Sequence, residues 1–410
     1  MTLHSGATLT WLDLTSADRD KVRRVLDLFK EKGTVDELGL GTLRDLLADT
    51  LFPGTSVLHT RLRYVLFIPW IYQHLESRVG KLSNVDDEAR ALEIRLIGAL
   101  KTREPSGAGI IGVEAHEELR RLPSSVYWAA LARWGIFAPG QSQGWYHRHF
   151  RRLASQREQT AADDPGLTWT KTPTWHLHLP RPPTGFLEKT TFALTREEAV
   201  FVQQTLETRV QGSLLGQLAA QVPPSIRGAA NLWDVPEAWK LPPNIRLTVE
   251  LARRFSLHVE GAALLYNLLL AEKRQALQGQ QTGKDADLID SYRQDLSTWA
   301  EVEAAEESFD HEALWTLAAR QGVRLRPPQK AFLKTWTEQV AENGPARIAD
   351  SDSARDLLTR REISLKGARA RVKNVNRLLD WSGRTGVGRM GFRWSQVRRL
   401  LMDLQDGLAA

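Results

Sequence analysis

The sequence predicts a mainly α-helical fold: a multi-helical body with a helix-turn-helix-like segment, a short extended or β linker and a basic C-terminal helical unit. Apolar residues recur at spacings of three and four along most of the chain, which is typical of amphipathic helices. Capping residues, prolines and glycines bound these stretches. Hydrophobic residues make up 42% and charged residues 25% of the 410 positions, so the body is expected to bury a core.

Residues 1–150 are expected to form an N-terminal helical domain. Ser16 can cap its first helix, Pro53 and Gly54 stop its second, and Pro69 is expected to kink its third. The expected helices run over residues 17–32, 42–51, 56–76, 84–104, 114–122 and 125–134.

Residues 151–192 are expected to form a Pro-rich extended linker or a short ribbon of strands, because five prolines punctuate a weakly alternating stretch. A central helical domain is expected over 193–345, where Thr195 can cap the first helix. Its expected helices cover residues 196–209, 212–221, 243–275, 285–306, 312–321 and 330–342. The basic C-terminal helical unit, residues 346–410, follows.

Positive charge is concentrated near the C-terminal end. Twelve Lys or Arg residues and two acidic residues lie between Arg360 and Arg399, a net charge of +10, whereas the whole chain carries +6. A dense basic patch on a mildly acidic body is the electrostatic pattern of a polyanion-binding protein. The chain has no cysteine, which excludes disulfides, thiolate zinc sites and cysteine nucleophiles. We find neither a signal peptide nor an apolar run long enough to cross a membrane, so we expect a cytoplasmic protein.

A helix over 365–381 is expected to make the polyanion contact. On a helical wheel, four cations fall on one ridge and five apolar residues fall on another face. The ridge consists of Lys366, Arg369, Lys373 and Arg377, and the apolar face consists of Leu365, Ala368, Val372, Val375 and Leu379. The ridge would then point outward and contact nucleic-acid phosphates. The alternative is a solvated face that acidic residues of the body neutralise.

Residues 381–394 form a glycine-rich stretch after this helix. Gly386 to Gly391 matches the spacing GxGxxG, but a dinucleotide-binding loop must follow a strand, and a helix is expected here. We therefore expect no dinucleotide and no other cofactor. Arg384, Arg389 and Arg393 are candidates to hold phosphates together with backbone N–H groups, and the alternative is a plain connection between helices.

Arg61 is expected to be buried. On the predicted helix over 56–76 it falls among aliphatic side chains, and an arginine on an apolar face needs a carboxylate or a phosphate as its partner. We expect a structural ion pair with an acid such as Asp45 or Asp49, and the alternative is a ligand contact. Arg63 is expected nearer the outer face of the same helix.

Residues 120–137 have the order of a helix-turn-helix: a short helix, a Pro-Ser-Ser turn, a second helix and an exit at Gly-Ile. In that arrangement Ser125, Tyr127 and Trp128 would contact bases or phosphates from the start of the second helix. An ordinary helical hairpin is the alternative.

Three segments of the chain together resemble one family. They are LFPGTSVLHTRLRYVLFIPW, RRLPSSVYWAALARWGIF and NRLLDWSGRTGVGRMGFRWSQVRRLLMDLQDGL, which span residues 51–408. The resemblance is to the bacterial domain-of-unknown-function family 6361, whose members occur beside helicases and phospholipase-D-like nucleases in phage-defence loci. It implies an accessory role in DNA handling and supplies no catalytic residues.

Two His-x-His pairs, His147/His149 and His176/His178, are the remaining candidates for chemistry. On a strand, each pair would point one way and could share a metal ion. No carboxylate lies at a typical ligand spacing near either pair. We therefore expect no bound metal and no catalytic residue.

The first interpretation is a non-enzymatic accessory subunit of a bacterial anti-phage defence or DNA-processing system. It would bind DNA, or alternatively RNA, and a helicase or nuclease subunit of the same system would be its partner. A metal-dependent nuclease that uses the histidine pairs is one alternative. A protein–protein adaptor with a Trp-rich surface is the other, since the chain has 14 tryptophans.

Overall fold

The computed structural model describes residues 36–115, 118–158, 173–278 and 283–410. Within these residues the fold is mainly α-helical, as predicted, and the sole β pairing is an isolated bridge between Phe137 and Trp175. None of the described helices is both long enough and apolar enough to span a membrane. The first predicted helix, residues 17–32, lies outside the described residues.

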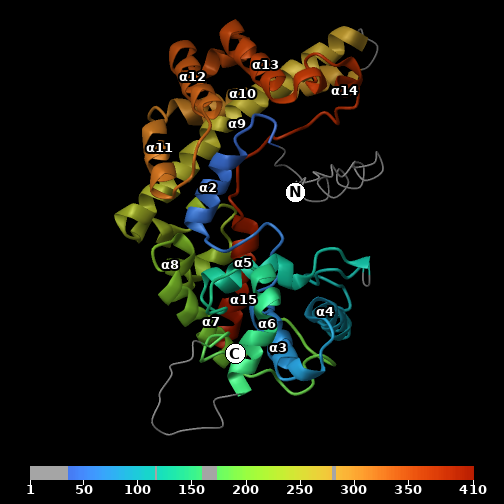
Figure 1. Ribbon diagram of the computed structural model, residues 1–410. Helices are drawn as coiled ribbons and strands as arrows, with labels where there is room; N and C mark the ends of the chain where they lie inside the picture. The colour runs from blue at the N-terminus through green and yellow to red at the C-terminus, as the bar shows by residue number, and fades with distance from the viewer. Residues whose placement is uncertain (1–35, 116–117, 159–172, 279–282) are drawn as a thin grey trace, which may run out of the picture. The chain divides into compact units, whose positions relative to one another are not determined.

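The chain divides into two compact units, each assembled from separate segments (Figure 1). Unit 1 combines residues 1–39, 260–305 and 339–388. Unit 2 combines residues 40–259, 306–338 and 389–410. Contacts within a unit therefore join parts of the chain that the predicted boundaries at 150, 192 and 345 separate.

Unit 2 contains most of the helices. They are α2 Gly41–Leu51, α3 Tyr64–Glu76, α4 Val85–Lys101, α5 Pro123–Arg133, α6 Gln143–Glu158, α7 Arg196–Arg209, α8 Leu214–Gln221, the first part of α9 Pro243–Gln278, α11 His311–Arg320, the first part of α12 Pro327–Asn343 and α15 Trp394–Ala409. Short 3₁₀ turns occur at Val79–Lys81, Pro224–Arg227, Leu232–Asp234 and Pro236–Lys240.

Helix α3 is the centre of the core of unit 2. Its residues from Tyr64 to Tyr72 are all buried, and the helix packs against α4, α5 and α6. Pro69 lies inside the helix. Around its C-terminal half, the rings of Tyr72, Trp128, Tyr146 and Trp175 contact one another at centroid distances of 5.3 to 6.1 Å. Such aromatic clusters bury much apolar area, which fixes the surrounding helices.

Helix α15 is held against α7 and α8 in unit 2. Its apolar stripe, Val397, Leu400, Leu401 and Leu404, is buried, as its amphipathic pattern requires. Helix α7 begins with a capping box in which Thr195 and Glu198 exchange side-chain and backbone hydrogen bonds. The chain's last helix is therefore part of the same packed unit as residues of the N-terminal half.

Unit 1 consists of the second part of α9, α10 Gly283–Ala304, the end of α12, α13 Asp352–Lys366 and α14 Val375–Leu379. Two 3₁₀ turns, Pro345–Asp350 and Gly367–Arg369, flank α13. Helices α9 and α10 lie side by side (Figure 1), and a Cβ at Gly261 would stand 2.3 Å from the ring of Trp299. Glycine at this position therefore allows the two helices to approach closely.

Several predicted elements differ from the structure. The helix over 56–76 begins only at Tyr64, because residues before it form turns. The described residues of 114–122 form turns and no α-helix. Helix α6 extends to Glu158 and so occupies the start of the predicted linker, whose middle lies outside the described residues.

Candidate nucleic-acid interface

The predicted helix over 365–381 is not formed, and this prediction was wrong. Helix α13 ends at Lys366, where Gly367 adopts a positive φ of 56°. A 3₁₀ turn and a further turn follow, and α14 starts only after Asn374, whose side chain accepts a hydrogen bond from the N–H of Arg377. We refer to residues 366–384 as the basic segment. Its cations cannot form one ridge of a single helix.

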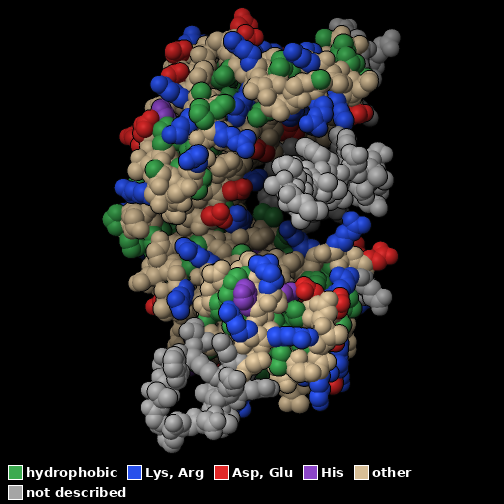
Figure 2. Space-filling model, in the orientation of Figure 1, with side chains coloured by type: hydrophobic (Ala, Val, Ile, Leu, Met, Phe, Trp, Pro, Cys, Tyr) green, Lys and Arg blue, Asp and Glu red, His purple; other side chains and the backbone are tan. Residues whose placement is uncertain are grey.

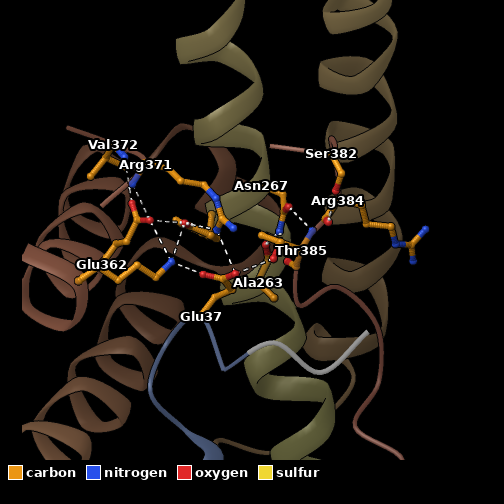
Figure 3. Close-up of polar contacts among 11 residues, drawn as sticks. Glu37, Ala263, Asn267, Glu362, Arg371, Val372, Ser382, Arg384 and Thr385 are labelled. Atoms are coloured by element: carbon orange, nitrogen blue, oxygen red, sulfur yellow. Dashed lines mark hydrogen bonds and ion pairs between the residues drawn. The ribbon is translucent and has the colours of Figure 1, made fainter. Parts of the chain in front are cut away.

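A buried carboxylate holds the first turn of the basic segment (Figure 3). Glu362 has 0% exposure and accepts hydrogen bonds from the N–H of Arg371 at 2.9 Å and the N–H of Val372 at 3.0 Å. The hydroxyl of Tyr266 donates to it at 2.6 Å, and Lys366 Nζ lies 3.0 Å away. Burial alone would raise the pKa of Glu362, but these hydrogen bonds and the Lys366 charge outweigh it and lower the pKa below its ordinary value.

Glu37 is the second carboxylate of the same cluster. It pairs with Lys366, with Arg371 at 3.0 Å, and accepts a hydrogen bond from Thr385 Oγ1 at 2.7 Å. Burial opposes ionisation of Glu37, yet the hydrogen bond and charge of Lys366, with further contributions from Arg371 and Thr385, lower its pKa. Lys366 is therefore not the outward cation that was predicted, because two carboxylates neutralise it.

Side chains of neighbouring helices hold the backbone of the glycine-rich stretch through hydrogen bonds. Asn267 donates to the carbonyl of Thr385 at 2.7 Å and accepts from the N–H of Thr385 at 2.9 Å. Tyr292 donates to the carbonyl of Gly383 at 2.7 Å. Arg274 donates to the carbonyl of Trp381 at 2.6 Å and lies over its ring. These contacts use helix α9 and helix α10 to fix residues 381–385, so this part is an ordered connection.

Four cations of the basic segment remain exposed: Arg369, Lys373, Arg377 and Arg384. None of the four forms an ion pair with any residue that the structure describes. Figure 3 shows the Arg384 side chain pointing away from the Glu37 and Glu362 cluster. Asp380 is the only exposed acid in this segment. The segment therefore presents net positive charge to solvent even after its buried pairs are counted.

The predicted apolar face also differs. Leu365, Val375 and Leu379 are exposed, whereas Val372 is buried beside the Glu362 contact. Because the helix breaks at Gly367, wheel positions no longer describe which side chains face the core. Around α14, exposed cations therefore lie close in sequence to the exposed side chains of Val375 and Leu379.

Arg389 and Arg393 belong to unit 2 and have contacts there. Arg393 donates to Asp49 at 2.6 Å and to the carbonyl of Thr55 at 2.9 Å. The charge of Arg389 contributes to lowering the pKa of Glu306, after the hydrogen bond from Arg253. Both guanidinium groups therefore interact with other residues of unit 2. This does not favour their predicted role as phosphate ligands in a glycine loop.

Arg61 lies in the turn before α3, and its partner is Asp403 at 2.9 Å. The predicted ion pair is thus present, but the named acids Asp45 and Asp49 were wrong, because the partner comes from α15. Arg63 was predicted to face outward and is instead buried, with Glu198 at 2.7 Å. The helical wheel failed here because residues 61–63 precede the helix.

Two of the three predicted helix-turn-helix contacts are not accessible. Helix α5 contains Ser125, Tyr127 and Trp128, but the last two are buried in the core. Tyr127 donates to the carbonyl of Arg61 at 2.8 Å, and Trp128 donates to the carbonyl of Gln141 at 2.9 Å. Ser125 is exposed and donates to the carbonyl of Leu122. Tyr127 and Trp128 therefore pack the body and do not face a ligand.

The first histidine pair lies on helix α6, not on a strand. His147 bridges Tyr72 at 2.8 Å and Asp86 at 2.6 Å, which engages both ring nitrogens. His149 contacts the carbonyl of Trp145 at 2.7 Å. Within the described ranges, no three His, Asp or Glu side chains converge as a metal site. The prediction that the protein holds no metal stays a prediction.

The anchoring carboxylates Glu37 and Glu362 were missed by sequence reasoning. The sequence could have indicated Glu362, because Glu362 and Asp380 are the only acids among the twelve cations between Arg360 and Arg399. An acid inside such a run is a natural partner for its neighbours. Glu37 had no local signal, because it lies more than three hundred residues from the residues it pairs with.

A family model described as "Family of unknown function (DUF6361)" matches residues 6–408. Neither the curated proteins nor the solved structures contain a match to the chain.

Proposed function

We propose that this chain, which belongs to the family of unknown function DUF6361, binds nucleic acid through the four exposed cations of its basic segment. DNA is the preferred ligand in this proposal, and RNA is the alternative. The protein would serve as a non-enzymatic accessory subunit of a bacterial anti-phage defence or DNA-processing system.

The observation that carries the proposal is a division among the cations of one short segment. Lys366 and Arg371 form ion pairs with the buried carboxylates Glu37 and Glu362. These ion pairs fix the backbone of the segment. Arg369, Lys373 and Arg377 stay exposed on that fixed backbone without ion pairs to described residues. Unpaired cations on an ordered support are suited to contacting phosphates, because little conformational entropy is lost on binding.

The surface around this segment is compatible with a polyanion. Figure 2 shows Lys and Arg side chains on the visible face over α13 and α14. The segment has four exposed cations and only one exposed acid, Asp380. Each phosphate contact releases condensed counterions, so affinity should fall steeply as salt rises.

The test is fluorescence anisotropy with labelled single-stranded DNA, duplex DNA and RNA. The charge-reversal variant Arg369→Glu/Lys373→Glu/Arg377→Glu is expected to lose binding while its circular dichroism stays unchanged, because these side chains make no core contact. The control Lys101→Glu/Arg181→Glu/Lys189→Glu changes the charge equally at exposed positions of unit 2 and should bind like the parent. Equal affinity of the two variants would remove the basic segment from the interface.

A protein–protein adaptor is the second candidate, and one observation favours it. Leu365, Val375 and Leu379 are exposed in the same unit as the basic segment. No tryptophan in the described ranges is exposed, so this part of the chain shows no Trp-rich surface; Trp11 and Trp169 lie outside those ranges. Salt separates the candidates, because apolar contacts do not weaken as salt rises, whereas phosphate contacts do.

The helicase or nuclease partner rests on the family resemblance alone. It stays a prediction, and co-purification from cells that express the neighbouring genes would test it.

A further inference from the structure

A second cationic site lies in unit 2, in an open cavity of about 420 Å³. The turn that precedes α3, the loop at residues 108–109 and the first turns of α15 form its walls. Arg61 and Arg399 both line the cavity. This cavity contains no residue of the basic segment.

Arg61 is fixed along most of its length. Its Nε donates to both oxygens of Asp403, at 2.9 and 3.1 Å. Its guanidinium lies 4.5 Å from the ring centre of Phe192. Gly109, at φ 80°, leaves room for the aliphatic stem, because a Cβ there would stand 2.7 Å from Arg61 Cγ. The stem, the Nε and the ring contact therefore determine where the end of the side chain points.

The two terminal nitrogens of Arg61 have no acceptor among the described residues, although the side chain is only 15% exposed. Arg399 approaches the same carboxylate through its Nε at 3.4 Å and also has no acceptor for its terminal nitrogens in the described part of the chain. One carboxylate thus faces two guanidinium groups. The cavity wall is left with an excess of positive charge and several unused N–H donors.

One further feature of the cavity fits an anionic ligand. The backbone N–H groups of Ser395 and Gln396 open the 16-residue helix α15 and have no acceptor within the described ranges. His59 is 3% exposed, and its Nδ1 lacks a partner among the described residues. Its Nε2 contacts the carbonyl of Val126, which can only accept, so Nε2 carries the proton and Nδ1 is an acceptor that is closed to solvent.

We propose that this cavity binds a phosphoryl group. The forks of Arg61 and Arg399 and the N–H groups of Ser395 and Gln396 would bind its anionic oxygens. Burial lowers the pKa of His59 to about 4, so this ring is neutral at neutral pH and adds no charge of its own to the cavity. This site goes beyond the proposed function, because it lies in the other unit and uses none of the cations assigned above.

Calorimetric titration with inorganic phosphate, at ionic strength held constant with sodium chloride, tests the site. The parent is expected to bind phosphate saturably. Arg399→Gln should weaken binding about tenfold or more, since it removes charge-assisted hydrogen bonds. Arg399 is 46% exposed, so the variant should fold. The control Arg95→Gln removes an exposed guanidinium of unit 2 outside the cavity and should bind like the parent.

Arg61→Lys is the second variant. It keeps the positive charge beside Asp403 and removes the terminal fork, so it should melt near the parent and also lose about tenfold or more in phosphate affinity. Absence of saturable binding in the parent would overturn the proposal. So would parental affinity in both Arg399→Gln and Arg61→Lys.

The source of the phosphoryl group is separated with two oligonucleotides, one carrying a 5′-phosphate and one carrying a 5′-hydroxyl. Preference for the 5′-phosphate that disappears in Arg399→Gln supports a nucleic-acid end as the ligand. Equal binding of both oligonucleotides, with inorganic phosphate still bound, supports a small phosphorylated molecule. The charge-reversal variant of the basic segment should retain phosphate binding, so failure of the two proposals is distinguishable.

Discussion

Glu362 is the contact on which the geometry of the basic segment depends most. Replacing it with glutamine keeps the shape of the side chain but removes its charge and one acceptor. The least costly orientation places the new amide nitrogen opposite the N–H of Val372, at the present 3.0 Å position, where two donors would meet. The other orientation would break the contacts of Tyr266, Lys366 and Arg371 instead.

The magnitude follows from the hydrogen bonds that change. Losing one hydrogen bond to a charged group costs about 1.5–3 kcal/mol, and the three that become neutral each weaken by about 0.5 kcal/mol. The turn at residues 370–373 should therefore open more easily by at least about 3 kcal/mol, which is roughly a hundredfold or more in its opening equilibrium. The loss is local, because the contacts concerned join residues within unit 1.

Amide hydrogen exchange followed by NMR measures this opening. In Glu362→Gln, exchange at Arg371 and Val372 is expected to be about a hundredfold faster than in the parent. Asp380→Asn is the matched control, because it removes an exposed carboxylate of the same segment, and exchange at these two positions should not change. Parental exchange rates in Glu362→Gln would refute the role of this carboxylate as the anchor of the segment.

Three further outcomes are expected. The pKa values of Glu37 and Glu362 are lowered in the folded protein. Their contribution to stability is therefore present above the unfolded pKa near 4.3 and is lost as pH falls through the folded pKa values. Thermal melts of unit 1 should show this loss only below about pH 4.3. Arg63→Ala strands the buried carboxylate of Glu198 and should cost on the order of 3–5 kcal/mol in urea unfolding; a cost below about 1 kcal/mol would show that the pair is dispensable. Glu93 is fully buried, and burial raises its pKa to about 7. Stability that is present below the unfolded pKa is therefore lost as pH rises to 7, and Glu93→Gln should reduce this loss by roughly 3 kcal/mol. An unchanged dependence of stability on pH in Glu93→Gln would contradict this.

The sequence predicted the helices that carry their own boundary signals. Thr195 caps α7, as expected, with Glu198 as the second member of its capping box, and α4 begins at Val85, close to the expected start at 84, where Asn84 caps it. These features depend on residues within one or two turns. Local sequence is sufficient for them because the interactions themselves are local.

The errors share a different cause. The wheel at 365–381 assumed a continuous helix, but Gly367 leaves the helical region, and the N–H groups of Arg371 and Val372 bind Glu362 instead. The wheel at 56–76 assumed a helix before Tyr64, where the hydroxyl of Tyr127 in fact binds the backbone of Arg61. Tertiary contacts decided the backbone in both places. Spacing alone cannot reveal a partner that lies far away in the sequence.

The same distinction applies to the candidate interface. The concentration of cations was visible in the sequence, and four of the seven predicted contacts are exposed: Arg369, Lys373, Arg377 and Arg384. The other three, Lys366, Arg389 and Arg393, have structural contacts. The fold decides which cations form ion pairs, because it places Glu37, Asp49 and Glu306 beside some of them and not beside others.

The salt dependence of nucleic-acid binding tests the central claim most directly. The affinity of the parent and of Arg369→Gln/Lys373→Gln/Arg377→Gln for duplex DNA should be measured by fluorescence anisotropy over a range of sodium chloride concentrations. If each side chain contacts one phosphate, the slope of log K against log salt should flatten by about 2.7, at roughly 0.9 per contact. An unchanged slope with unchanged affinity would contradict the assignment of the basic segment as the nucleic-acid interface.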